Sequence, residues 1–318
     1  MARGRDDDSG LDRVIGSLDE APVGLHDLDA AAPRLPDGLP EALIDLYARC
    51  DGGRLFLETL EIAPSADVVS PRPGRWQFAT LAGEPVTVDK RGRVFGIDDT
   101  LDDEVCEGTR LDRWLAGFVD ATALLYDHDG EFAEDIFDEE GDLLPEVRER
   151  QLRAQLKRDG GSPAVRWRLA GLIAAKGETA RARDELEQVV AAEPAFAWAW
   201  LDLARLSEQL GDLSNAMDEI QAAAEAAAGA KHPQAGYFFA QLARVAVRAG
   251  DESTRTMAAS TAARLAPELK RAQLDGALAS IADADLDSAR GLLDLLKAVW
   301  PKDLEVLDLA TRIERAAN

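Results

Sequence analysis

The stretch 170–212, AGLIAAKGETARARDELEQVVAAEPAFAWAWLDLARLSEQLGD, carries the same pattern of small residues at its start and near its end. In each copy a leucine and an alanine precede a glycine by eight and seven residues: Leu169 and Ala170 before Gly177, and Leu203 and Ala204 before Gly211. The two glycines are 34 residues apart. Recurrence at a fixed interval predicts a repeat architecture, in which each unit buries its apolar face against its neighbours.

The pattern continues toward the C-terminus. Leu242 and Ala243 precede Gly250 at the same spacing, and a looser copy ends at Ala284, so the later intervals are 39 and 34 residues. An insertion within 229–234 accounts for the longer interval. Apolar spacing within each unit is helical, and prolines follow three of the four copies at a common distance. Residues 163–301 are therefore predicted to form four stacked helix pairs.

This L-A…G…A…P pattern resembles the tetratricopeptide repeat. The resemblance is physically reasonable because alanines let paired helices approach closely, the glycine supplies the turn, and the proline ends the second helix. Ser162 and Pro163 are predicted to begin the array as helix cap and first helical residue. Residues 302–318 are predicted to form a C-terminal capping helix, with Leu304, Leu307 and Leu309 on its apolar side.

The resemblance implies a concave binding surface lined by the first helix of each pair. The positions that it assigns to this surface are Trp167, Trp198, Leu201, Arg205, Tyr237, Arg244, Arg248, Arg271 and Leu274. Aromatic side chains beside arginines suit a protein partner that offers an acidic or extended peptide. Alternatively, the aromatics pack between repeats and the arginines form a solvated face. The two asparagines, Asn215 and Asn318, do not form the asparagine-rich carboxylate clamp of chaperone-binding relatives.

The residues before the repeats show a different pattern of apolar residues. Apolar residues at helical spacing predict an amphipathic helix over 40–50, and Asp51-Gly52-Gly53 ends it. Strand-like runs follow at 55–62, 76–81, 84–89 and 93–97, and the last two read as a hairpin. A second helix is expected from 111 to 125. These elements predict an α+β domain with a mainly antiparallel sheet, followed by an all-α tetratricopeptide-like solenoid.

The words LPEALIDLYARCDGGRLF and GRVFGIDD in the first part resemble the SUKH superfamily, which includes a yeast cell-wall assembly regulator and many bacterial immunity proteins. The resemblance covers residues 36 to about 126 and implies a non-enzymatic binding fold. We therefore expect an N-terminal extension over 1–35, a SUKH-like domain over 36–126, and an acidic linker with a capping helix over 127–162.

Charge restricts the partners. The chain has a formal net charge of −24, which disfavours binding to the phosphate backbone of nucleic acids. Residues 97–145 hold 17 acidic side chains against Arg110 and Arg113. This acidic strip either steers a basic partner, such as a nuclease-type toxin, or is a solvated linker. Asp127, Asp129 and Glu131 are out of register for an EF-hand, so no calcium site is predicted.

Catalytic motifs are absent from the sequence. The three histidines, His26, His128 and His232, lie in no zinc-protease motif, and the phosphate-binding glycine patterns do not occur. Cys50 and Cys106 are expected to be buried apolar side chains. No enzyme activity, metal or cofactor is predicted, and an enzyme that uses a metal at the acidic strip is the weakest reading.

Two functional hypotheses remain. The first is a non-enzymatic adaptor that binds a protein or peptide on the concave face of the repeats. The alternative is an immunity protein whose acidic SUKH-like domain neutralises a basic toxin. The sequence has no apolar run of the roughly 20 residues that cross a bilayer, so we expect a cytoplasmic location and no membrane partner.

Overall fold

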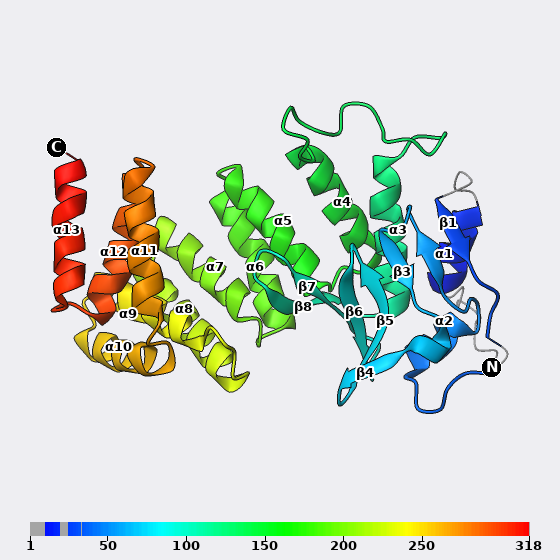
Figure 1. Cartoon of the computed structure of the whole chain (residues 1–318), viewed down its shortest axis with the longest axis horizontal. Helices are drawn as coiled ribbons and strands as arrows, with labels where there is room; N and C mark the ends of the chain where they lie inside the picture. Colours follow the sequence, from blue (N-terminus) through cyan, green and yellow to red (C-terminus); the bar gives the residue numbers. More distant parts are fainter. Residues whose placement is uncertain (1–9, 20–24, 33, 318) are drawn as a thin grey trace. The chain divides into compact units, whose positions relative to one another are not determined.

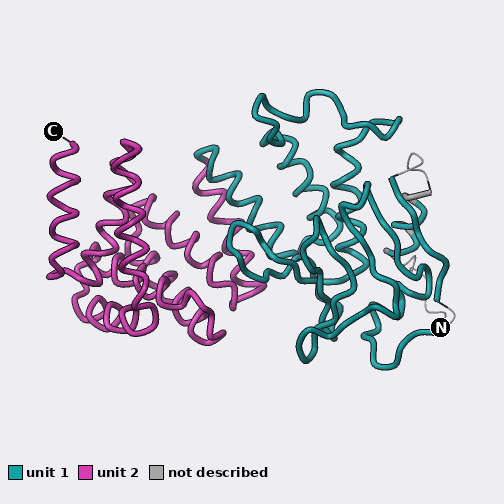
Figure 2. Tube along the Cα trace, viewed as in Figure 1, with its two compact units in different colours: residues 1–177 teal, residues 178–318 magenta. Residues whose placement is uncertain are grey.

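The computed structural model describes residues 10–19, 25–32 and 34–317. The chain divides into two compact units, residues 1–177 and 178–318 (Figure 2). The predicted fold class is confirmed: an α+β part with an antiparallel sheet is followed by an all-α solenoid of the tetratricopeptide type (Figure 1).

Unit 1 contains an eight-stranded sheet in which the strands run in the order β1-β2-β3-β5-β6-β7-β8, with β4 paired to β5. Neighbouring strands pair antiparallel. The strands are β1 (His26–Leu28), β2 (Gly53–Leu55), β3 (Leu60–Ile62), β4 (Val69–Arg72), β5 (Arg75–Leu81), β6 (Glu84–Asp89), β7 (Val94–Asp98) and β8 (Asp103–Gly108). The helices are α1 (Gly10–Asp19), α2 (Glu41–Tyr47), α3 (Leu111–Thr122), α4 (Pro145–Arg158) and α5 (Pro163–Ala175), with short 3-10 turns η1 (Ser65–Asp67) and η2 (Ala123–Leu125).

The single strand expected over 55–62 is wrong, because the chain turns in its middle. Phe56, Leu57 and Glu58 have φ angles of 52°, 54° and 72°, which are incompatible with a strand. The run therefore becomes β2 and β3, paired to each other. Strands β1, β4 and β8 are not among those expected from the sequence. Strand β4 has four exposed residues and β8 is rich in acids, so neither shows the alternation on which strand prediction depends.

One face of the sheet forms the core of unit 1. Phe78, Val88 and Val94 are fully buried on this face and belong to one cluster with Leu43 of α2 and Leu115 of α3. Alternation along each strand directs these side chains to the helices and the intervening ones to the outer face. The predicted helices over 40–50 and 111–125 therefore both cover the sheet.

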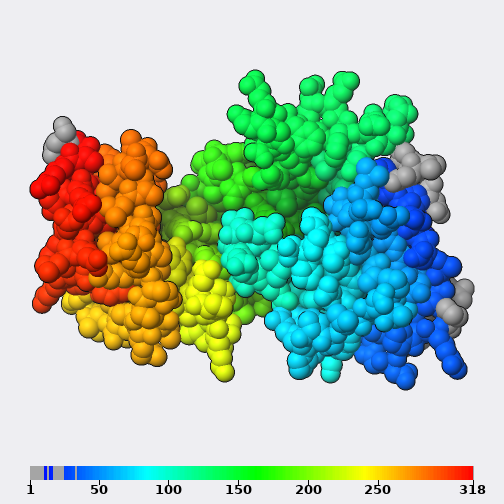
Figure 3. Space-filling model, viewed as in Figure 1, coloured from blue at the N-terminus to red at the C-terminus, as the bar shows by residue number. Residues whose placement is uncertain are grey.

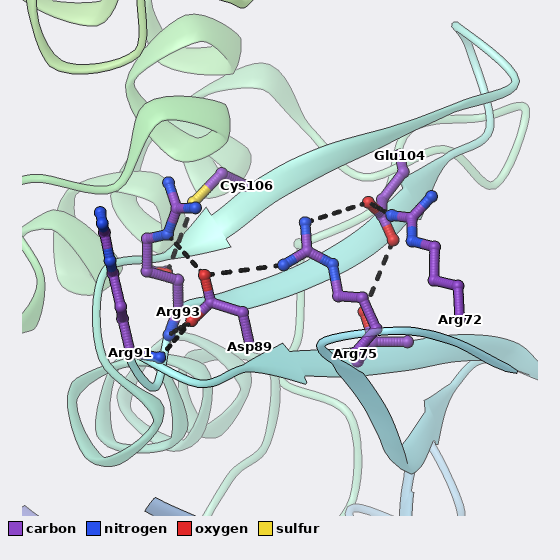
Figure 4. A network of polar contacts seen from close by, with 9 residues as sticks. Arg72, Arg75, Asp89, Arg91, Arg93, Glu104 and Cys106 are labelled. Carbon is purple, nitrogen blue, oxygen red and sulfur yellow. Dashed lines mark hydrogen bonds and ion pairs between the residues drawn. The ribbon is translucent and has the colours of Figure 1, made fainter. Parts of the chain in front are cut away.

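The outer face carries a polar network that includes Arg75, Asp89 and Glu104 (Figure 4). The guanidinium of Arg75 lies 3.3 Å from the centre of the Phe95 ring and pairs with Asp89 at 3.6 Å and Glu104 at 3.4 Å. Glu104, on β8, also pairs with Arg72 on β4, although three strands separate β4 from β8 in the sheet order. The sheet is therefore strongly curved. Burial raises the pKa of Asp89, but hydrogen bonds from Arg93 and the Arg91 amide outweigh it and leave that pKa below its ordinary value.

Helix α5, the first helix of the predicted repeat array, is fastened to the sheet within unit 1. Arg168 donates to Asp98 at 2.8 Å and to Glu107 at 2.6 Å, and both carboxylate side chains are about one-tenth exposed. The Ser162 hydroxyl donates to the Glu107 carbonyl at 2.7 Å and accepts the Val165 amide, so it caps α5 as predicted. Removing one partner of such a buried ion pair destabilises the fold, because the other charge is left buried without a counter-charge.

Unit 2 consists of successive helices joined by short turns. They are α6 (Thr179–Ala192), α7 (Ala197–Gln209), α8 (Leu213–Gly229), α9 (Ala235–Ala249), α10 (Glu252–Leu265), α11 (Leu269–Ala282), α12 (Leu286–Val299) and α13 (Leu304–Ala316). Gly211 and Gly250 have φ angles of 79° and 74°, as the predicted turns require, and Ala284 adopts 61° at the third turn. The aspartate that follows each turn caps the next helix: Asp212, Asp251 and Asp285.

The recurring alanines lie inside the helix stack. Ala204, Ala216 and Ala243 are at most 1% exposed and belong to one core cluster with Ile220 and Phe238. Such small side chains leave room for neighbouring helix backbones to come close together. The repeat spacing read from the sequence therefore corresponds to a packing requirement.

The capping helix is present as α13, but its apolar stripe differs from the prediction. Val306, Leu309 and Ile313 are buried, whereas Leu304 is 81% and Leu307 46% exposed. Asp303 caps the helix by accepting the amides of the two residues after Leu304. This start sets the helix phase so that of the three predicted leucines only Leu309 faces the stack.

Candidate protein-binding surface

The first helices of two adjacent repeats, α7 and α9, carry matching polar and aromatic side chains. We define the α7–α9 surface as Trp198, Asp202, Arg205 and Glu208 of α7 with Tyr237, Gln241, Arg244 and Arg248 of α9. On each helix these positions recur at three- or four-residue intervals, which places them on one side of the helix. Helices α7 and α9 also share one core cluster.

Glu208 is the anionic centre of this surface. Its carboxylate accepts hydrogen bonds from both terminal nitrogens of Arg244, at 3.1 and 2.5 Å, and also forms an ion pair with Arg248. The Glu208 side chain is only 7% exposed. The Nε of Arg244 donates to Gln241 at 2.8 Å. All three guanidinium nitrogens of Arg244 thus bond to side chains of this chain, whereas the Arg248 side chain remains 49% exposed.

Tyr237 connects the two helices of the α7–α9 surface through its hydroxyl group. Its hydroxyl oxygen accepts from Gln241 Nε2 at 2.9 Å and from Arg205 Nη2 at 3.2 Å. With both donors directed at the oxygen, the hydroxyl proton of Tyr237 is left to donate elsewhere. Arg205 also pairs with Asp202 at 2.9 Å and keeps 46% of its side chain exposed.

Trp198 forms the aromatic end of the surface. Its ring centre lies 4.9 Å from that of Phe238, 6.1 Å from that of Tyr237 and 6.2 Å from that of His232. Within the part of the chain that the structure describes, the buried indole Nε1 of Trp198 meets no hydrogen-bond partner, whereas that of Trp200 donates to the Pro194 carbonyl at 3.0 Å. A buried donor of this kind normally has a partner, so the site lacks one acceptor.

The other predicted surface residues lie elsewhere. Leu201 is 1% exposed and packs in the core cluster with Phe238, so its side chain does not line a surface. Arg271 and Leu274 lie on α11, where they line a groove shared with α13. Trp167 belongs to α5 in unit 1 and is half-buried.

Sequence reasoning missed the acids and the amide that organise the surface. Asp202, Glu208 and Gln241 belong to no repeat motif. Asp202 and Gln241 bond arginines of their own helices, and nothing in the sequence shows that Glu208 of α7 meets two arginines of α9. One signal was available, since Asp202 and Gln241 are 39 residues apart, the interval between their repeats.

A second buried polar cluster lies on α6, α7 and α8. Ser207 donates to Glu219 at 2.6 Å and Arg183 pairs with the same carboxylate at 3.1 Å. Burial raises the pKa of Glu219 above its ordinary value, and the contacts with Ser207 and Arg183 only partly oppose this. The Glu219 side chain is 9% and the Arg183 side chain 20% exposed, so the cluster is mostly buried.

The acidic strip offers exposed carboxylates without a built metal site. Asp127, His128 and Asp129 place potential ligand atoms within 4.8 Å of one another, and all three side chains are exposed. One oxygen of Asp127 already accepts the amides of Asp129 and Glu131, which closes a turn. In the ranges that the structure describes, no helix combines the length and apolar character needed to span a membrane.

Comparison with known proteins identifies the repeats. Residues 174–242 match the Tetratricopeptide repeat family. Structures that resemble the chain include PilF of Pseudomonas aeruginosa, with 17% identity and a TM-score of 0.38 over 54% of this chain and 77% of that one. MamA has 16% identity and a TM-score of 0.37 over 54% of this chain and 91% of that one. YrrB, a TPR protein described as having an unusual peptide-binding site, has 15% identity and a TM-score of 0.34 over 52% of this chain and 84% of that one.

No curated protein sequence matches the chain. The C-terminal part is thus of the tetratricopeptide type, as the sequence predicted. The resemblance of residues 36–126 to the SUKH superfamily stays a prediction, and the alternative of an immunity protein with a basic toxin partner gains no support.

Proposed function

We propose that this chain is a non-enzymatic interaction protein that binds a segment of a partner protein on the α7–α9 surface. The observation that carries the proposal is that two arginines of this surface remain exposed while their neighbours are held by hydrogen bonds. Arg205 and Arg248 stay half-exposed at 46% and 49%, while Tyr237, Gln241, Arg244 and Glu208 hold one another in place between them. Side chains fixed before binding lose little conformational entropy when a ligand arrives.

The chemistry of the surface favours an extended peptide that carries carboxylate groups. Each exposed guanidinium offers charge-assisted hydrogen bonds to a carboxylate, and Tyr237 offers a hydroxyl proton. Among the described residues, the buried indole N–H of Trp198 meets no acceptor. Trp, Tyr and Arg are also the residue types that contribute most to protein interfaces. The match to the Tetratricopeptide repeat family supports a protein or peptide partner.

The proposal is tested by selecting ligands from a random peptide library displayed on phage, with the full chain as bait. Dissociation constants of the selected peptides are then measured by calorimetry. We expect the double variant Arg205→Glu, Arg248→Glu to bind at least about tenfold more weakly, because two attractive contacts become repulsive. Arg290→Glu, at a 51% exposed position on α12, is the control and should bind normally. Equal affinities for the chain and both variants would show that the ligand binds elsewhere.

A further inference from the structure

The loop between η2 and α4, residues 126–144, exposes two phenylalanines among acidic side chains. Phe132 is 54% and Phe137 42% exposed. The loop sequence holds nine aspartates and glutamates and no lysine or arginine. All nine acidic side chains are exposed. Figure 3 shows the side chains of this loop, in bluish green, projecting from unit 1 at the top of the view. The loop therefore combines an apolar contact area with a strong negative charge.

The two exposed rings continue a row of aromatic contacts that begins in the core of unit 1. Phe56, which is 3% exposed, stacks on Tyr126 with 5.8 Å between the ring centres. Tyr126 stacks on Phe132 at 5.0 Å, and Phe132 meets Phe137 edge to face at 5.5 Å. The exposed rings therefore have defined positions, and covering them with a ligand costs little further ordering.

Two turns of the same design hold the loop in shape. In each turn one carboxylate oxygen, of Asp127 or of Asp138, accepts two backbone amides at 2.8 to 3.1 Å. The residues that flank each turn pair across it, and an aromatic residue belongs to both pairs: Tyr126 with Phe132, and Phe137 with Leu143. A solvated linker explains neither this order nor two exposed phenylalanines.

The acidic side chains of the loop have no basic counterparts in the part of the chain that the structure describes. None of the nine forms an ion pair with a lysine or arginine there, and Asp129 contacts only the neighbouring His128, at 3.2 Å. Negative charges gathered in one loop repel one another, and a cation bound among them relieves this repulsion.

The sheet of unit 1 shows the complete form of this chemistry. The Arg75 guanidinium lies 3.3 Å from the centre of the Phe95 ring and pairs with two carboxylates, those of Asp89 at 3.6 Å and Glu104 at 3.4 Å. The faces of phenyl rings attract cations, and carboxylates beside them add charge-assisted hydrogen bonds. The 126–144 loop supplies rings and carboxylates in the same way, but no cation from the described ranges lies over its rings.

We infer that the 126–144 loop binds a segment of a partner protein that is rich in arginine and lysine. Cationic side chains of the segment lie over Phe132 and Phe137 and pair with the surrounding carboxylates, while their aliphatic parts cover the exposed ring surface. A second copy of the chain, with its net charge of −24, is disfavoured here, as are nucleic acids and acidic lipids. A lone calcium or magnesium ion takes oxygen ligands and gains nothing from the rings.

Fluorescence anisotropy with a labelled peptide of alternating arginine and glycine measures binding to the full chain in about 0.15 M salt. We expect the double variant Phe132→Ala, Phe137→Ala to bind about tenfold more weakly, although its charge is unchanged. Phe132→Tyr, Phe137→Tyr keeps the ring faces and should retain the affinity. The matched control is Ile44→Ala, Val69→Ala, since these side chains of α2 and β4 are also 42% and 54% exposed, and it should bind normally.

Removing charge tests the other half of the inference. The triple variant Glu131→Gln, Glu134→Gln, Glu139→Gln leaves the two turn aspartates intact. It should bind the peptide more weakly than the parent chain, and the difference should shrink as salt is raised.

Four results would each overturn the inference: no binding of the arginine peptide, an alanine variant that binds as the parent does, a tyrosine variant as weak as the alanine variant, or an equal loss in the matched control. Binding that depends on charge alone is thereby recognised. None of these outcomes depends on the α7–α9 surface, because the ligand proposed there is acidic and its arginines are unchanged in every variant.

Discussion

Single residues decide what the α7–α9 surface can exchange with a partner. Arg244 and Arg248 contact the same carboxylate, that of Glu208, and look equivalent in the sequence. The structure separates them, because the Arg244 side chain is 19% and the Arg248 side chain 49% exposed. Arg244 therefore maintains the surface, and Arg248 is the one available to a ligand.

We expect Arg244→Glu to destabilise the chain by about 3–5 kcal/mol, because it leaves the buried Glu208 beside a like charge. Arg248→Glu should cost less than about 1 kcal/mol, since solvent screens that position. Urea denaturation followed by circular dichroism measures both. Similar midpoints for the two variants would contradict the internal role of Arg244.

Glu219 is expected to make stability depend on pH. Burial raises its pKa in the folded chain above the ordinary 4.5, so the folded state binds more protons than the unfolded state just above that pH. Its contribution to stability is present below pH 4.5 and is lost as pH rises through the raised pKa. Denaturation of the chain and of Glu219→Gln between about pH 4 and 7 gives the difference. Parallel profiles would refute the assignment.

At the scale of elements, close contacts between helices explain why small residues recur. A Cβ atom on Gly236 of α9 would lie 2.4 Å from the Cβ of Ala266, which follows α10. Gly291, in the middle of α12, has no neighbouring atom within 4 Å of such a Cβ. The two helical glycines therefore exist for different reasons, and only the first is required by packing.

Gly236→Ala should destabilise the chain by about 1–3 kcal/mol through overpacking against Ala266. Gly291→Ala should stabilise it by up to about 1 kcal/mol, because alanine favours the helix and meets no neighbour. Thermal unfolding of both variants beside the parent gives the two signs. A stabilised Gly236→Ala would mean that α9 and α10 are not packed as described.

Elements also show where prediction from the sequence succeeds and where it ends. The helices of unit 2 follow from the spacing of Gly211, Gly250 and the buried alanines, because close packing restricts those positions to small residues. Strands β4 and β8 could not be found, since their residues are exposed or acidic and show no alternation. The contact of Glu208 with Arg244 joins two residues that are 36 positions apart on different helices, and no local sequence pattern predicts it.

On the scale of the whole molecule, two units of different construction carry different surfaces. Unit 1 uses arginines to hold its sheet and α5 together, as the pairs of Arg168 with Asp98 and Glu107 show. Unit 2 uses alanines to stack its helices and leaves arginines at one surface and leucines at another. The repeats thus account for the proposed contact of a peptide on α7–α9.

The most direct test of the central claim, that partners bind on α7–α9, is site-specific photocrosslinking in the native cell. The crosslinking amino acid p-benzoylphenylalanine replaces Arg248 of α9 or, as control, Met257 of α10, which are both about half-exposed. We predict that irradiation yields adducts with a partner protein from position 248 and none with that partner from position 257. Adducts from position 257 alone would contradict the account.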